Sequence, residues 1–282
     1  MGRLGTVEAL FRYPVKSMLG ESVERVGIDE HGVVDDRGWA VRDERRGDLF
    51  TAKRLGALMG CRGVGGEGGS VPEIELPDGS RFPADAAEAA ERLSKALDHP
   101  VTLVRRGVET PPPDEVDTPD DPMADFNSMF ARKEAEPVPD FSVTPEPLVA
   151  HMMRPDRTFV DLAPLLVMTR QSIDTLAAAA PDSIMDVRRF RPSLLIDAAS
   201  EDRFPEQAWV GGRLRIGSVL IDSPMTCPRC VMTTHGFADL PKDPKVMRNL
   251  VSEADGNLGI YGLVLEPGEI RVGDVVESVE PS

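Results

Sequence analysis

Short apolar and β-branched runs alternate with turn signals over the first hundred residues. The predicted strands are residues 7–11, 23–28, 39–42, 71–76 and 101–104, and Gly, Pro and Asp separate them. Short strands at such spacing are typical of a compact β-barrel or sandwich. One helix is predicted at 84–97, because this Ala-, Glu- and Leu-rich stretch follows a proline and ends before Pro100, where helical conformation is disfavoured.

The same pattern returns in the C-terminal part, from residue 158 onward. Residues 161–168 indicate a turn entering a buried strand, and residues 172–180 indicate a helix capped by Thr169 or Ser172. Further strands are predicted at 194–196, 214–216, 219–221, 260–265 and 275–279. The chain is therefore predicted to be mainly β with some α, with an N-terminal β-barrel-like domain followed by a second β-barrel domain.

An acidic, proline-rich stretch separates the two regions. Residues 109–156 are dense in Pro, Asp and Glu, a composition that buries little apolar area against the cost of ordering the backbone. Phe126, Met129 and Phe130 within it could form a docking patch or a short lid, or they could pin the stretch to the core. The predicted division is a domain over 1–106, a linker or excursion over 107–157, and a domain over 158–282.

Charge and length narrow the classes of protein. The chain has 282 residues and a formal net charge of -16, which argues against nucleic acid or an anionic membrane as the main partner. No apolar run approaches the roughly 20 residues of a membrane span, and the first residues lead directly into a strand pattern without a signal peptide. These features predict a soluble, cytoplasmic protein, and the odd count of 3 cysteines predicts free thiols.

Two of the cysteines stand in the segment Cys227-Pro228-Arg229-Cys230. This spacing fits a redox disulfide pair, half of a zinc site, one metal-binding thiolate with a helper, or two small buried hydrophobes. A zinc site is disfavoured because no second pair of ligands follows at a matching spacing, and His235 is the nearest candidate. Arg188, Arg189 and Arg191 precede the segment, so in this acidic chain the arginines predict an anion pocket or, alternatively, surface ion pairs.

Six segments then point to a known family. They are Tyr13-Pro14-Val15-Lys16-Ser17, Asp36-Arg37-Gly38-Trp39, Phe190-Arg191-Pro192-Ser193, Gly217 with the strand after it, Cys227-Pro228-Arg229-Cys230 and Val272-Gly273-Asp274. In this order and rough spacing they resemble proteins with an N-terminal MOSC β-barrel domain followed by a MOSC domain. Among such proteins, the chain resembles the mitochondrial amidoxime-reducing components and the bacterial reductases of N-hydroxylated bases.

The resemblance implies a molybdenum cofactor, Mo-molybdopterin. It assigns the metal and the catalytic role to Cys230, and a soft thiolate suits such a metal. It further implies that the cofactor is bound by Lys16, Ser17, Arg37, Arg191, Ser193 and Arg229. Arg54, in a family segment that approaches the pocket, is a weaker candidate. The chain departs from the amidoxime reducers at Ser193, where they have Asn, and at Ala163, where they have Ser.

The function expected from this resemblance is molybdenum-dependent reduction of N-hydroxylated small molecules. The alternatives are a sulfurtransferase or sulfur carrier with a persulfide on Cys230, and a non-catalytic molybdenum cofactor carrier. His235 or Asp239 could move protons or simply belong to a loop. With 3 cysteines and no Gly-x-Gly-x-x-Gly segment between a strand and a helix, the chain shows no second redox centre, so a separate electron donor, a reductase or ferredoxin-like carrier, is expected.

Overall fold

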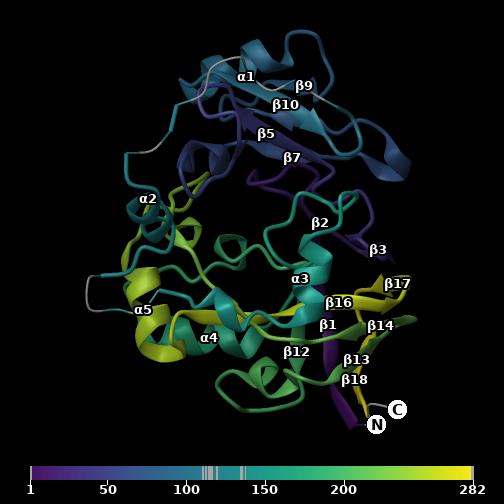
Figure 1. Cartoon of the computed structure of the whole chain (residues 1–282). Coiled ribbons are helices and arrows are strands. Elements are labelled where there is room, and N and C mark those ends of the chain that lie inside the picture. The colour runs from purple at the N-terminus through teal and green to yellow at the C-terminus, as the bar shows by residue number, and fades with distance from the viewer. Residues whose placement is uncertain are drawn as a thin grey trace.

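The computed structural model describes residues 2–280 apart from 110, 112, 114–116, 119, 134, 135 and 137. Its fold is mainly β with a few helices, as the sequence predicts, and Figure 1 shows an N-terminal unit stacked on a barrel that carries most of the C-terminal residues. None of the described helices is long and apolar enough to span a bilayer. The α-helices are α1 (Ala89–Leu97), α2 (Pro122–Ser128), α3 (Glu146–Met152), α4 (Arg170–Ala179) and α5 (Lys245–Ala254).

Seven strands close into a barrel. Its hydrogen-bonded order is β11, β12, β1, β18, β13, β14 and β16, and β16 pairs back to β11. All neighbours are antiparallel except β11 and β12. Closure leaves no unpaired edge in the ring, which removes the usual aggregation hazard of a sheet edge. The barrel strands are β1 (Gly2–Arg12), β11 (Leu165–Thr169), β12 (Leu194–Ala198), β13 (Arg213–Ile216), β14 (Val219–Asp222), β16 (Asn257–Glu266) and β18 (Val275–Val279).

The first strand of the chain completes this barrel. Strand β1 lies between β12 and β18, with Leu10 opposite Leu194 and Thr6 opposite Val275. The two ends of the chain therefore lie side by side, and the Gly2 N–H donates to Ser278 Oγ over 3.1 Å (Figure 1). The domain limits 1–106, 107–157 and 158–282 stay a prediction, but β1 belongs in space to the C-terminal barrel.

The N-terminal unit consists of short sheets covered by α1. Helix α1 begins later than the predicted residue 84, because Pro83 is still paired with Glu73 and a turn must follow it. Two sheets belong to this unit: β10 (Val101–Arg105), β5 (Trp39–Asp43) and β6 (Leu49–Phe50), and β7 (Arg62–Val64), β8 (Glu73–Glu75) and β9 (Arg81–Pro83). A third sheet joins β3 (Arg25–Asp29) and β4 (Gly32–Val33) to β17 (Gly268–Arg271), while β2 (Glu21–Val23) pairs with β1 and β15 (Thr226–Pro228) with β16.

The cores of the two units meet near the cysteine segment. One apolar core fills the barrel, another lies under α4 and α5, and a third fills the N-terminal unit. Phe237 and Leu240, which follow the cysteines in sequence, pack in the N-terminal core. The C-terminal chain thus joins the two units beside the cysteine segment. The 3-10 helices are η1 (Gly56–Gly60), η2 (Glu67–Gly69), η3 (Phe141–Val143), η4 (Val187–Arg189), η5 (Pro205–Trp209) and η6 (Val231–Thr234).

Candidate functional site

One pocket at this junction gathers all the residues that the sequence analysis assigns to the metal and the cofactor, apart from the weaker candidate Arg54. Its lining comes from the loop after β1, the entrance of β11, the turn after η4 and the segment from β15 to η6. The structure therefore brings together segments separated by up to two hundred residues, although the roles assigned to their side chains stay predictions. The predicted residues in the lining are Lys16, Ser17, Arg37, Arg191, Ser193, Arg229 and Cys230.

Three of these residues have a strained backbone. Ser17, Arg37 and Arg191 adopt φ values of 68°, 46° and 57°. Positive φ is uncommon for residues with a side chain, and such strain persists where the surrounding structure holds it, often at binding sites. The turns that contain these residues are also fixed by backbone hydrogen bonds, including Arg37 N–H to Tyr13 O over 2.7 Å and Arg191 N–H to Val187 O over 3.2 Å. The cationic side chains consequently leave their turns in defined directions.

Tyr13 supports two of the cations. The guanidinium carbons of Arg37 and Arg191 lie 4.8 and 4.2 Å from the centre of its ring. The Tyr13 hydroxyl donates to Pro192 O over 3.0 Å. Burial raises the pKa of Tyr13 to about 12, so the phenol stays neutral at physiological pH. Sequence analysis quoted Tyr13 only as part of a motif and missed this supporting role.

Two buried guanidinium groups are incompletely bonded. Arg191 donates through Nη1 to Met18 O, and Arg229 donates through Nη2 to Phe190 O over 2.5 Å and through Nη1 to Cys227 Sγ over 3.1 Å. Among the described residues, nothing accepts a hydrogen bond from Arg191 Nη2 or Arg229 Nε, and both atoms are buried. Unsatisfied buried donors are rare because they cost free energy, so these two atoms indicate room for acceptors supplied by a ligand.

Asp161 joins two lysines at the pocket. Lys16 Nζ contacts Asp161 Oδ1, Lys53 Nζ lies 2.8 Å from Asp161 Oδ2, and Lys16 also donates to Phe159 O over 2.9 Å. Burial lowers the pKa of Lys16, which Asp161 offsets only in part. Burial alone would raise the pKa of Asp161, but the two ammonium groups hold it well below its usual range. The carboxylate is therefore charged at neutral pH.

Sequence analysis missed Lys53 and Asp161 in this arrangement. Of the neighbours Lys53 and Arg54, the sequence analysis named only Arg54, as a weaker candidate. Arg54 instead pairs with Asp48 over 2.6 Å and with Asp125 over 3.0 Å, and it does not line the pocket. The side that each neighbouring residue faces depends on the local turn, which the residue types alone do not reveal.

The two cysteines occupy different environments. Cys227 is 4% exposed, with its sulfur against Arg229, whereas Cys230 is only partly buried, and both are free thiols. Burial raises the pKa of Tyr261 well above its usual value, and the adjacent Cys227 adds to this shift. Cys230 immediately precedes η6, and its carbonyl accepts from Thr233 Oγ1 over 3.1 Å. Both cysteines line the pocket, and the less buried Cys230 is the better placed of the two to meet a ligand there.

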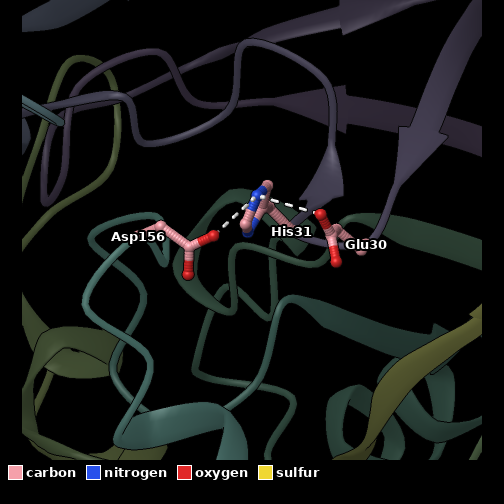
Figure 2. Close-up of side chains that lie close together, drawn as sticks. All are labelled: Glu30, His31 and Asp156. Atoms are coloured by element: carbon pink, nitrogen blue, oxygen red, sulfur yellow. Dashed lines mark ion pairs between the residues drawn. The ribbon is translucent and has the colours of Figure 1, made fainter.

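A second group of ligand-type side chains lies elsewhere. Figure 2 shows the His31 ring between the carboxylates of Glu30 and Asp156, with His31 Nε2 3.7 Å from each. Arg154 pairs with both carboxylates, over 3.1 Å to Glu30 and 3.0 Å to Asp156. Arg154 balances part of the negative charge of the two carboxylates. We therefore interpret the group as an ion-pair network rather than a metal centre. Within the described part of the chain, neither cysteine belongs to a group of three such ligands, which gives the zinc alternative no support.

Arg189 organises the loop that follows Cys230. Its side chain is fully buried, and its guanidinium donates to the carbonyls of Ile184, Thr233, His235 and Pro241. His235 is held by a contact of 2.7 Å between Nε2 and Ala52 O, and Asp239 pairs with Arg188 at the surface. Neither His235 nor Asp239 lines the pocket, an arrangement that favours the loop role over proton transfer.

Replacing Arg189 by methionine should therefore destabilise the fold strongly. We expect a loss of at least about 3 kcal/mol in the free energy of unfolding, because several buried carbonyls lose a charged donor. The matched control is Arg188→Met, which removes partly exposed ion pairs with Asp186 and Asp239 and should cost no more than about 2 kcal/mol. Urea denaturation followed by circular dichroism measures both. Equal losses in the two variants would contradict a special role for the buried guanidinium.

Comparison with known families covers both units. Residues 4–97 match the family described as the MOSC N-terminal beta barrel domain, and residues 154–277 match the MOSC domain. The chain is 34% identical over 131 residues to human mitochondrial amidoxime reducing component 2, an alignment that covers 42% of this chain and only 38% of the human protein. It is 25% identical over 304 residues to mouse mitochondrial amidoxime-reducing component 1, covering 97% of this chain and 82% of that one.

Among solved structures, the YUAD protein from Bacillus subtilis aligns with 99% of this chain and 97% of its own. The TM-score of that alignment is 0.45 and the sequence identity is 11%.

Proposed function

We propose that this chain, which combines a MOSC N-terminal beta barrel domain with a MOSC domain, is a molybdenum-cofactor-dependent reductase of N-hydroxylated small molecules. The observation that carries the proposal is the meeting, in one pocket, of a half-exposed cysteine with buried and incompletely bonded arginines. The names of the relatives, which describe them as amidoxime-reducing components, agree with this class of reaction.

The residues present fit such a cofactor chemically. A thiolate is a soft ligand of the kind that suits molybdenum, and Cys230 would hold the metal. Guanidinium groups bind phosphate with two parallel hydrogen bonds, while a lysine acts as a single point charge. Arg191 and Arg229 have free donors for this purpose, and Lys16, Ser17, Arg37 and Ser193 complete the set. Sequence analysis omitted Lys53, which we add to it.

The reaction consumes two electrons and two protons. The N–O bond of the substrate breaks, one proton forms a new N–H bond on the nitrogen, and the other joins the hydroxyl oxygen, which leaves as water. When bound, the molybdenum cofactor would supply the electrons to the substrate. The protein's own residues would bind the cofactor's anionic groups, hold its metal at Cys230 and leave room in the pocket for the substrate.

The metal content of the purified protein tests the proposal. Protein made in a host that synthesises the cofactor should carry molybdenum approaching one equivalent, and it should release a fluorescent pterin on oxidative denaturation, because one thiolate and one anion pocket imply one cofactor. Elemental analysis and fluorescence measure the two quantities. Zinc or no metal, together with no pterin, would overturn the proposal in favour of a persulfide carrier on Cys230. Full molybdenum without turnover would favour the non-catalytic carrier.

The reductase would also need a separate electron donor. With 3 cysteines in the chain, there are too few thiolates for a four-cysteine iron–sulfur cluster beside Cys230. Turnover should consequently require a chemical reductant or an added reductase and carrier protein, and NAD(P)H alone should not support it.

A further inference from the structure

The acidic segment between the two domains returns to the pocket and crosses beside it. We call residues 120–133 the strap. Its Asp125 pairs with Arg46 over 3.1 Å and with Arg54 over 3.0 Å, which ties it to the N-terminal unit. The Val231 N–H donates to Met129 O over 2.8 Å, which ties it to the barrel. Because Val231 follows Cys230 directly, this second bond brings the strap next to the proposed metal ligand.

Further bonds hold the strap at its C-terminal end. Arg132 donates to Phe130 O over 3.0 Å and contacts Met247 Sδ on α5, and Arg248 on the same helix donates to Ala131 O. Together with the bond to Met129 O, these contacts hold the backbone carbonyls of residues 129–131. They therefore fix the point at which the Phe130 side chain leaves the backbone. The strap is an ordered part of the site despite its polar composition.

Two phenylalanines from this region form an aromatic wall, by which we mean Phe130 and Phe141. Both line the pocket, Phe130 is 5% exposed, and their ring centres are 5.7 Å apart. Phe126 packs against both rings from outside the lining, at 5.2 and 6.2 Å. The wall is apolar, unlike the rest of the pocket, which is rich in lysine and arginine. Asp161 is the only carboxylate among the described lining residues.

We propose that the aromatic wall selects the substrate, favouring N-hydroxylated compounds whose N–O group is carried by an aromatic ring. This inference rests on the proposed function, because it places the N–O group toward Cys230 and the ring against Phe130 and Phe141. Aromatic rings attract one another in offset or edge-to-face contacts beyond what their buried area provides. A substrate that carries only a small aliphatic group would make no ring contact with the wall.

A matched pair of substrates tests the wall. Benzamidoxime and acetamidoxime present the same N–O group, on a phenyl ring and on a methyl group. In the molybdenum-loaded protein, Phe141→Leu keeps an apolar side chain but removes the ring, and we expect it to raise KM for benzamidoxime about three- to tenfold. The KM for acetamidoxime should change less than about twofold, because a methyl group makes no ring contact. Val143→Ala, an exposed position in the same short helix, is the control and should leave both values unchanged.

Binding measurements separate this inference from the proposed function. If the wild-type chain reduces neither amidoxime, the proposed function fails, yet calorimetry can still compare the two compounds as ligands of the wild type and of Phe141→Leu. A preference for benzamidoxime that Phe141→Leu abolishes supports the wall in either case. Equal changes for both compounds, or no change, would overturn it. A fall in pterin content in Phe141→Leu would also overturn it, since the ring would then face the cofactor and not the substrate.

Discussion

Replacing Cys230 by serine should abolish the reduction of an N-hydroxylated substrate, whereas replacing Cys227 should leave most of it. We expect a loss of at least about 100-fold for Cys230→Ser, because the metal loses its ligand, and of less than about tenfold for Cys227→Ser, below the roughly 10- to 100-fold typical of groups that orient a ligand. Cys230 is the less buried of the two and lines the pocket, where it can reach a metal, while the sulfur of the buried Cys227 is engaged by Arg229.

The two cysteine variants need a readout besides turnover. Molybdenum X-ray absorption should lose one thiolate ligand in Cys230→Ser and keep it in Cys227→Ser. Turnover with a dye reductant removes any dependence on the natural electron donor. If the two variants lose activity to the same degree, the cysteines act as a unit and a dithiol mechanism replaces the single-thiolate one.

The second large effect concerns Arg191. Its loss in Arg191→Ala should weaken retention of the cofactor by about 30-fold or more, because hydrogen bonds between charged partners are worth about 2 kcal/mol or more. Burial lowers the pKa of Arg191 to about 10, so the guanidinium is charged at neutral pH. Retention of an anionic cofactor should therefore be complete below that value and should weaken as pH rises through it.

Pterin content after dialysis and the melting temperature of the cofactor-free protein together measure the role of Arg191. We expect the pterin content to fall and the melting temperature to stay nearly constant. Arg203→Ala is the matched control, because that arginine is exposed and pairs only with Glu253 at the surface among the partners described. An apo form destabilised by several kcal/mol, with normal occupancy in what stays folded, would assign Arg191 to the fold instead.

The sequence predicted most strands and all the pocket cations that belong to motifs, for physical reasons that can be traced. A short, fully apolar run such as residues 194–196 marks a strand that is buried on both faces, here β12. Such a pattern does not reveal which strands pair with each other. The sequence analysis therefore placed β1 in the N-terminal domain, although β1 pairs with β12, almost 200 residues further along the chain, and with β18, more than 200 residues further along. Pairing over such distances is decided by how the barrel closes.

The missed parts of the site depend on contacts and not on residue types. Lys53 and Asp161 became visible only as an ion pair, and Tyr13 only as a support for two guanidinium groups. The strap was misleading because its composition resembles that of a flexible linker. A few hydrogen bonds to backbone carbonyls and three rings in tilted or edge-on contact nevertheless order it, and composition averages hide such local anchors.

The position of β1 has a consequence for how the protein is made and divided. The strand is synthesised first, yet its neighbours β12 and β18 follow only after residue 193 and residue 274. During translation β1 can therefore pair early only with β2, and the final ring can close only once β18 has left the ribosome. Closure of such distant segments is slow, since the entropy of a long loop is lost before any contact rewards it. A fragment that begins near residue 154, where the match to the MOSC domain begins, would lack β1. The edges of β12 and β18 would then be open to pairing with other chains.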